Sequence, residues 1–303
     1  MLVEGHVARG SSAHRLGHFA SARVHFETSI ALYDVTVRGG QPTFFDDPKV
    51  SALFWLASTL WALGYPDQAL VCCAEAEDAA REISHPYCQC NALAGATMVH
   101  EFRREPEAIE KYADALIALA AEQGFAFWSK IGAASRSLAV IQQGRGTGQE
   151  LAQLRGAIET MGATGALDPA LWFKGSLAQA HLHLGDIDAA LESSQEGLQL
   201  TRQYGERWLE ALFLRLLGDV LLASSNGVEI EVENFYVESI EVARRQEAKS
   251  LELQAALGLA RLWSGQGKRK PALELLQPVY DWFTEGRSTP DHVEAAALLA
   301  QLR

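Results

Sequence analysis

The sequence is short of several features that would point to a particular class of protein. Its 303 residues include only four cysteines, in two close pairs, Cys72 with Cys73 and Cys88 with Cys90. Both spacings are shorter than the C-x-x-C typical of a structural zinc site, and a cysteine in an apolar helical pattern behaves as a small hydrophobic residue. We therefore predict free thiols and no metal site, and nothing in this pattern demands an oxidising compartment.

Long hydrophobic runs are also missing. No window approaches the roughly 18 consecutive apolar residues of a membrane-spanning helix. Residues 1–12 lack the continuous apolar stretch of a signal peptide. These two absences predict a cytoplasmic protein without a membrane partner.

Basic residues are outnumbered by acidic ones, 26 against 38, which gives a net charge of −12. The densest basic run is only three residues long, Lys268 to Lys270. Because so acidic a surface repels phosphate backbones, we expect no nucleic-acid partner. The apolar fraction of 48% is nevertheless large enough for an extensive core, which excludes a disordered or collagen-like chain.

The motifs of common enzymes do not occur. Residues 144–148 are rich in glycine but lack the lysine of a phosphate-binding loop, and they follow a helical pattern instead of a strand. There is no G-x-S-x-G nucleophile elbow. His181 and His183 fall on different sides of a helix, and His100 has no second histidine four residues on, as a zinc protease would need. We therefore predict no enzymatic activity, no cofactor and no metal.

What the sequence does contain is a repeat. A small turn residue, an aromatic or apolar residue, an alanine and a pair of core residues at helical spacing recur about seven times. The average step is about 42 residues. The repeated alanines are Ala22, Ala69, Ala108, Ala190 and Ala272. Apolar residues recur with a 3.6-residue period on both sides of each turn, so each unit is predicted to be a helix–turn–helix pair.

This pattern resembles the tetratricopeptide repeat, whose usual period is about 34 residues. It predicts an all-α, tetratricopeptide-like solenoid, a right-handed superhelix of about seven helix pairs with a C-terminal capping helix from about residue 290. We expect a single domain over residues 1–303, with a long loop at 34–49 and a break near 224–231. The repeat has a small residue at the eighth position of its first helix, and along the chain this residue appears as Gly10, Ala57, Ala96, Ala178, Gly218 and Ala260.

Several segments also resemble one bacterial family, the C-terminal repeat region of class III adenylate/guanylate cyclases and predicted-ATPase signalling proteins. The most specific segments are residues 60–70 (LWALGYPDQAL) and 280–286 (YDWFTEG). Shorter matches lie at residues 17–23, 31–34, 84–86, 122–125, 205–208, 215–219, 243–246 and 260–263. The resemblance implies a sensory or regulatory arm. The catalytic cyclase and ATPase domains of that family have no counterpart in these 303 residues.

In repeats of this type, residues two, five, nine and twelve of each first helix face the concave groove. That register selects the candidate binding residues Phe54, Trp61, His100, Gln179, Arg215, Asp219 and Arg261, together with Ser58, Thr97 and Gln254. Aromatic and arginine side chains on a concave surface are typical binding anchors, although most helical aromatics are core residues and Arg215 with Asp219 is also an ordinary i,i+4 pair.

We therefore expect a regulatory scaffold that binds a protein or peptide in this groove. The partner would be a separate molecule or the catalytic domains of a longer parent protein. Two alternatives stay open at this point: a sensor of a small-molecule effector, and an enzyme built on the repeat scaffold.

Overall fold

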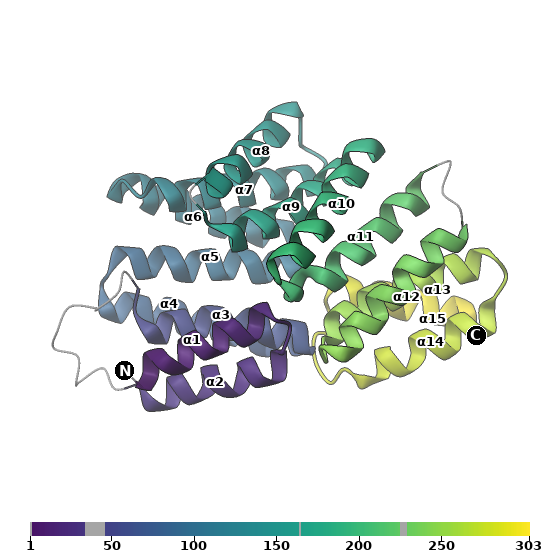
Figure 1. Cartoon of the computed structure of the whole chain (residues 1–303), viewed down its shortest axis with the longest axis horizontal. Coiled ribbons are helices and arrows are strands. Elements are labelled where there is room, and N and C mark those ends of the chain that lie inside the picture. Colours follow the sequence, from purple (N-terminus) through teal and green to yellow (C-terminus); the bar gives the residue numbers. More distant parts are fainter. Residues whose placement is uncertain (1, 34–45, 164, 225–228) are drawn as a thin grey trace.

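A computed structural model describes residues 2–33, 46–163, 165–224 and 229–303 of the chain (Figure 1). These described parts contain fifteen α-helices, one short 3₁₀ helix and no β-strand. The helices are α1 Leu2–Arg15, α2 Phe19–Leu32, α3 Pro48–Leu63, α4 Pro66–Ile83, α5 Pro86–Phe102, α6 Pro106–Gln123, α7 Ala126–Gln142, α8 Gly148–Ala163, α9 Leu167–His183, α10 Ile187–Tyr204, η2 Arg207–Leu209, α11 Glu210–Ala223, α12 Glu229–Arg245, α13 Lys249–Gly265, α14 Arg269–Trp282 and α15 Pro290–Leu302. The predicted all-α solenoid is confirmed.

The local signals in the sequence explain where the helices begin and end. Gly64 and Gly124 adopt the left-handed backbone conformation, with φ of 94° and 70°, and so end α3 and α6. Proline occupies the first turn of α4, α5 and α6, where its missing N–H leaves no helical hydrogen bond unmade. Local residues therefore mark these helix boundaries in the sequence.

Small residues let the two helices of a pair approach closely, as the repeat pattern requires. A Cβ atom on Gly10 would lie 2.5 Å from the Phe26 ring of α2, and a Cβ atom on Gly218 would lie 2.8 Å from the Tyr236 ring of α12. Phe26 and Tyr236 are both fully buried. A larger residue at either glycine would force the two helices apart.

The predicted loop and break fall partly outside the described residues. Of the loop at 34–49, residues 34–45 are not described, and α3 already begins at Pro48. Of the break at 224–231, residues 225–228 are not described, and α12 already begins at Glu229. The last helix begins at Pro290, behind Thr289 as its N-cap.

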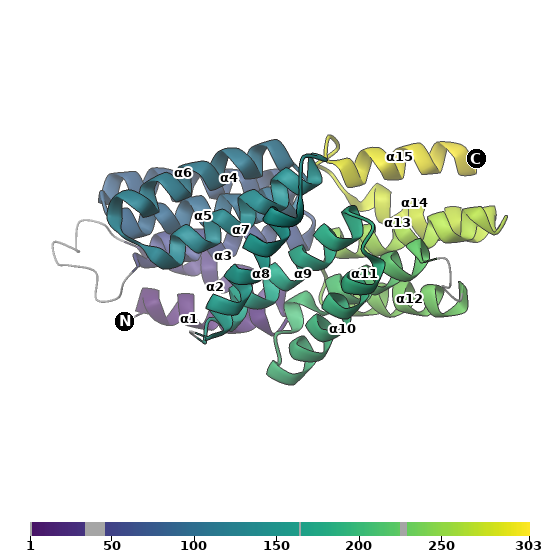
Figure 2. The same ribbon diagram turned by 90° about the horizontal axis from the view of Figure 1, so that it is seen from above.

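The odd-numbered helices form the inner layer of the solenoid. From α3 to α15, each contacts the odd-numbered helix before and after it, while the even-numbered helices cover the outside (Figures 1 and 2). The solenoid also closes on itself, because α13 contacts α3 and α1 contacts η2. In Figure 1 the first four helices and the last four accordingly meet end to end below the arch of α5–α11. This closure encloses the concave face.

Candidate functional site

The concave face holds a cavity of about 240 Å³, called here the central cavity. Helices α3, α5, α9, α11, α13 and α15 all contribute to its wall. Six of the residues selected by the groove register line it: Trp61, Gln179, Arg215, Asp219, Gln254 and Arg261. The structure thus brings together residues from four separate repeats, which no short sequence motif links.

Charges of both signs line the central cavity and pair with one another. Arg215 forms an ion pair with Asp219, and the Tyr236 hydroxyl donates to the other oxygen of Asp219 at 2.7 Å. Arg261 lies 2.5 Å from Glu294 of α15. These pairs hold the guanidinium groups at fixed positions along the wall, where they can exchange partners with an incoming polar ligand.

One wall of the central cavity contains a buried carboxyl group, that of Glu101. Its side chain is 5% exposed, and the Ser176 hydroxyl donates to Oε1 at 2.5 Å. Burial raises the pKa of Glu101 to about 8, an effect that the neighbouring Ser176 and Trp172 side chains only partly offset. At neutral pH this carboxyl therefore holds its proton and adds no negative charge to the cavity.

A second cavity of about 400 Å³, called here the aromatic cavity, lies nearer the N-terminal ends of the inner helices. Its aromatic walls are Phe54, Trp55, Tyr87, Phe127, Trp128, Trp172 and Trp208. Its polar lining consists of Asp46, Ser51, Asn91 and Asp168. Phe54, which the register groups with the other candidates, belongs to this second cavity.

An aromatic stack separates the two cavities. Trp61 lines the central cavity and stacks on Phe102, with ring centroids 4.5 Å apart. Phe102 in turn meets Trp208, a wall of the aromatic cavity, edge to face at 6.4 Å. The two cavities are therefore neighbouring parts of one concave face, divided by packed rings.

His100, Ser58 and Thr97 are placed away from both of these cavities. His100 turns toward α6, where its Nδ1 lies 2.6 Å from Glu105 and its ring stacks on Tyr112. Thr97 is fully buried, and Ser58 is 1% exposed. An inner helix packs against two neighbouring inner helices as well as its outer ones. Some of the positions that the groove register selects therefore face the protein core.

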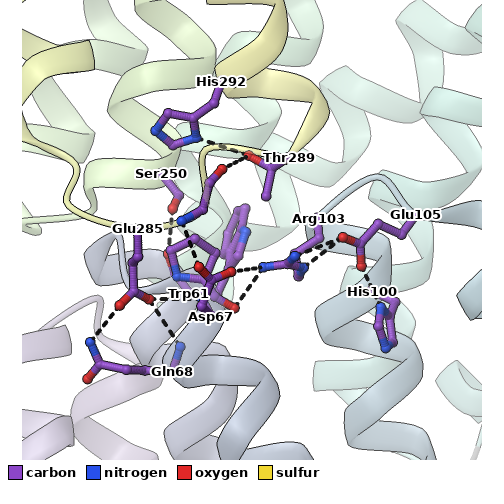
Figure 3. A network of polar contacts seen from close by, with 12 residues as sticks. Trp61, Asp67, Gln68, His100, Arg103, Glu105, Ser250, Glu285, Thr289 and His292 are labelled. Atoms are coloured by element: carbon purple, nitrogen blue, oxygen red, sulfur yellow. Dashed lines mark hydrogen bonds and ion pairs between the residues drawn. The ribbon is translucent and has the colours of Figure 1, made fainter.

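A polar network, which was not predicted, lies where the two ends of the solenoid meet (Figure 3), beside the packing of Trp282 on Tyr65. Arg103 donates to the Pro66 carbonyl at 2.8 Å and pairs with Glu105 at 2.9 Å. Asp67 accepts the Gly286 amide at 2.9 Å, and the Ser250 hydroxyl donates to the Trp61 carbonyl. The Asp67–Gly286 contact joins the two segments that carry the most specific resemblance, residues 60–70 and 280–286, although the sequence contains no sign of their proximity.

The described residues contain no group of three histidine, cysteine, aspartate or glutamate side chains placed to hold a metal ion. All four cysteines are buried free thiols, and burial raises the pKa of Cys90 to about 11. Among the described helices, none is long and apolar enough to cross a membrane.

Comparison with known proteins identifies the fold of the chain but assigns it to no sequence family. No protein-family profile matches the chain, and no curated protein matches its sequence. The structure is similar to that of NprR in complex with its cognate peptide NprX, with a TM-score of 0.60 and 12% identity over 99% of this chain and 82% of that chain. It is also similar to the apo form of RapI, with a TM-score of 0.56 and 12% identity over 99% of this chain and all of that chain. The fold is thus that of a tetratricopeptide-like helical repeat protein.

Proposed function

We propose that this chain is a regulatory scaffold that binds a protein or peptide segment in its concave face, with the central cavity as the main contact surface. One observation carries the proposal: six side chains selected as groove residues, from four repeats, converge on one cavity of about 240 Å³. The similarity to NprR, which was solved with its cognate peptide, supports it.

The chemistry of the central cavity suits an extended peptide. Arg215 and Arg261 offer donors for backbone carbonyls or carboxylates, and Asp219 and Asp291 offer acceptors for amides or basic groups. Trp61, stacked on Phe102, provides an apolar wall between these polar groups. A surface that alternates donors, acceptors and aromatic contact matches the repeating polar groups of a peptide backbone.

At a finer level, we propose that the chain works in the cytoplasm of a bacterium as the regulatory arm of a cyclase-like or ATPase-like signalling protein. Its partner is then a separate protein or the catalytic domains of a longer parent chain. The resemblance of residues 60–70 and 280–286 to that family supports this assignment.

Selection of binders from a random peptide library tests the proposal. The selected peptides are then measured against wild type, Arg261→Gln and the matched control Lys270→Gln, whose side chain is 85% exposed and not part of the central cavity. We expect Arg261→Gln to weaken binding by about tenfold, as for a lost charged contact, and Lys270→Gln to leave it unchanged. Equal affinity for all three proteins, or a library that yields no binder, would overturn the proposal.

A further inference from the structure

We infer that the aromatic cavity is a subsite for a cationic side chain, lysine or arginine, of the bound peptide. The inference rests on the proposed function, because it assigns a chemical class to one part of the ligand. It is carried by three features of the cavity: its aromatic walls, an arginine of the chain itself that already lies at its rim, and an excess of acidic groups.

The walls place several electron-rich ring faces around one space. Trp128 and Trp172 are 8% and 6% exposed, so their rings are held in place by the surrounding core. Phe127 is 39% exposed, which leaves one aromatic wall accessible from solvent. A cation within about 6 Å of such a ring is attracted by its quadrupole, and more strongly where water is excluded.

Arg15 of α1 shows how a cation binds at this wall. Its guanidinium carbon lies 5.9 Å from the centre of the Trp55 ring, and the same group forms an ion pair with Asp168. Trp55 and Asp168 are both part of the aromatic cavity. The chain thus uses one aromatic ring and one carboxylate of this cavity to hold a cation, and the remaining rings have no such occupant among the described residues.

Acidic groups outnumber basic ones around the aromatic cavity. Asp46 and Asp168 line it, and Glu206, 9% exposed, lies against Asp168 and Trp208. Arg15 is the one basic group that pairs with any of these three acids in the described residues. The carboxyl groups of Asp168 and Glu206 also hydrogen-bond to each other, which requires a proton between them. Burial and the neighbouring Asp168 raise the pKa of Glu206 to about 7, so a second cation would favour its charged form.

The acidic lining decides between a cationic and a purely apolar occupant. Asp168 and Glu206 have Arg15 as their one basic neighbour, so an apolar side chain would bury this acidic lining further without adding a second cation. A lysine or arginine side chain packs its aliphatic stem on the rings and brings its charge to the carboxylates. The net charge of −12 acts in the same direction, because it attracts a basic peptide from a distance.

The test uses two short peptides and the indole N–H signals of ¹⁵N-labelled protein, assigned with Trp→Phe variants. The probe is acetyl-Gly-Gly-Lys-Gly-Gly-amide, and its control has norleucine in place of lysine, which keeps the stem and removes the charge. We expect millimolar lysine peptide to shift the signals of Trp55, Trp128 and Trp172 but not that of Trp282. The norleucine peptide should bind at least fivefold more weakly, in keeping with the strength of a cation–π contact joined to an ion pair.

Two variants locate the effect. Asp168→Asn should weaken binding of the lysine peptide about fivefold. Asp188→Asn, at an exposed position of α10, should leave its binding unchanged. Asp168→Asn also removes the ion pair with Arg15, so a second variant is needed. Phe127→Leu serves this purpose, because the Phe127 ring is partly exposed and its loss is compatible with folding. It should weaken binding about threefold.

Equal binding of the two peptides, no indole shift, or no effect of either variant would overturn the inference. Because the lysine probe is read at the tryptophans of the aromatic cavity, these outcomes are separate from those of the Arg261→Gln experiment on the central cavity. A selected peptide that depends on Arg261 but not on Asp168 or Phe127 would support the proposed function and refute the cationic subsite.

Discussion

The Glu285 carboxylate caps the helix that carries Gln68, 217 residues earlier in the chain. Its Oε1 accepts the backbone N–H of Gln68 at 3.0 Å, and its Oε2 accepts the side-chain amide of the same residue at 2.9 Å. The backbone N–H of Asp67 donates to Oε1 as well. A residue of the last repeat thereby fulfils the capping role that a local serine or aspartate usually has at a helix N-terminus.

Glu285→Ala should therefore loosen both ends of the chain at once. We expect a loss of about 0.5–2 kcal/mol in the free energy of unfolding, the usual cost of an absent N-cap. In hydrogen–deuterium exchange the amides of Asp67 and Gln68 should exchange faster. Glu274→Ala, at an exposed position of α14, is the control. If these two amides exchange as in wild type, Glu285 does not cap α4 in solution.

Gly286→Ala tests the same contact by crowding it. The backbone at Gly286 has φ of 70°, and a Cβ atom there would lie 2.3 Å from the Pro66 ring. Gly124→Ala is the matched control, because Gly124 also has φ of 70° but nothing within 4 Å of the added atom. Each variant should lose about 1 kcal/mol through the left-handed backbone. Gly286→Ala should lose about 1–3 kcal/mol more by separating the two ends. Equal melting temperatures of the variants would contradict the close approach.

The buried Glu101 predicts a pH dependence of stability. With a pKa of about 8 in the folded chain and an ordinary value near 4.5 when unfolded, Glu101 binds its proton more tightly in the folded state. Its contribution to stability is therefore full below about pH 4.5 and is lost as the pH rises toward 8. Glu101→Gln, which keeps the acceptor for Ser176, should remove this loss and be more stable than wild type at pH 9 by roughly 1–3 kcal/mol.

Thermal melts of wild type and Glu101→Gln at pH 5 and pH 9 check this expectation. The difference between the two proteins should be small at pH 5 and should grow at pH 9. A difference that stays constant between these pH values would show that Glu101 does not titrate in this range.

Tyr236 links the core to the central cavity, because its hydroxyl donates to Asp219 while its ring fills the space beside Gly218 and Gly258. Tyr236→Phe should keep the ring packing and lose only the hydrogen bond, at a cost of about 1 kcal/mol. Tyr204→Phe, at a position 48% exposed, should change the free energy of unfolding much less. Denaturant titration of both variants measures the difference, and equal values would mean that the Tyr236 hydroxyl bond adds nothing to stability.

Local signals in the sequence were sufficient to predict the helix pairs. Gly64 and Gly124 end their helices by backbone conformation alone, and the small residues at Gly10 and Gly218 report a contact within one pair. The groove register selected Arg215 and its neighbours because a straight helix repeats its directions every 3.6 residues. That reasoning needs no knowledge of the curvature of the whole solenoid.

What depends on curvature could not be predicted. Phe54 and Trp61 share a helix face in the sequence, yet the structure assigns them to different cavities, because the packed rings of Phe102 and Trp208 come between. The aromatic cavity had a visible sign, aromatic residues early in successive inner helices such as Tyr87, Trp128 and Trp172. Only the three-dimensional path of the chain shows that these rings surround one space.

The contact between α3 and α13 also changes how this protein should unfold. An open repeat array melts progressively from its ends, since each repeat touches only its neighbours and its free energy is nearly a sum of local terms. Here the second and the last repeats stabilise each other, so neither end is free to fray alone. The closed superhelix should therefore unfold in one cooperative step. Deletion of α13–α15 should lower the stability of the repeat that contains Trp61, 189 residues from its contact Ser250, as much as that of the repeat beside the cut.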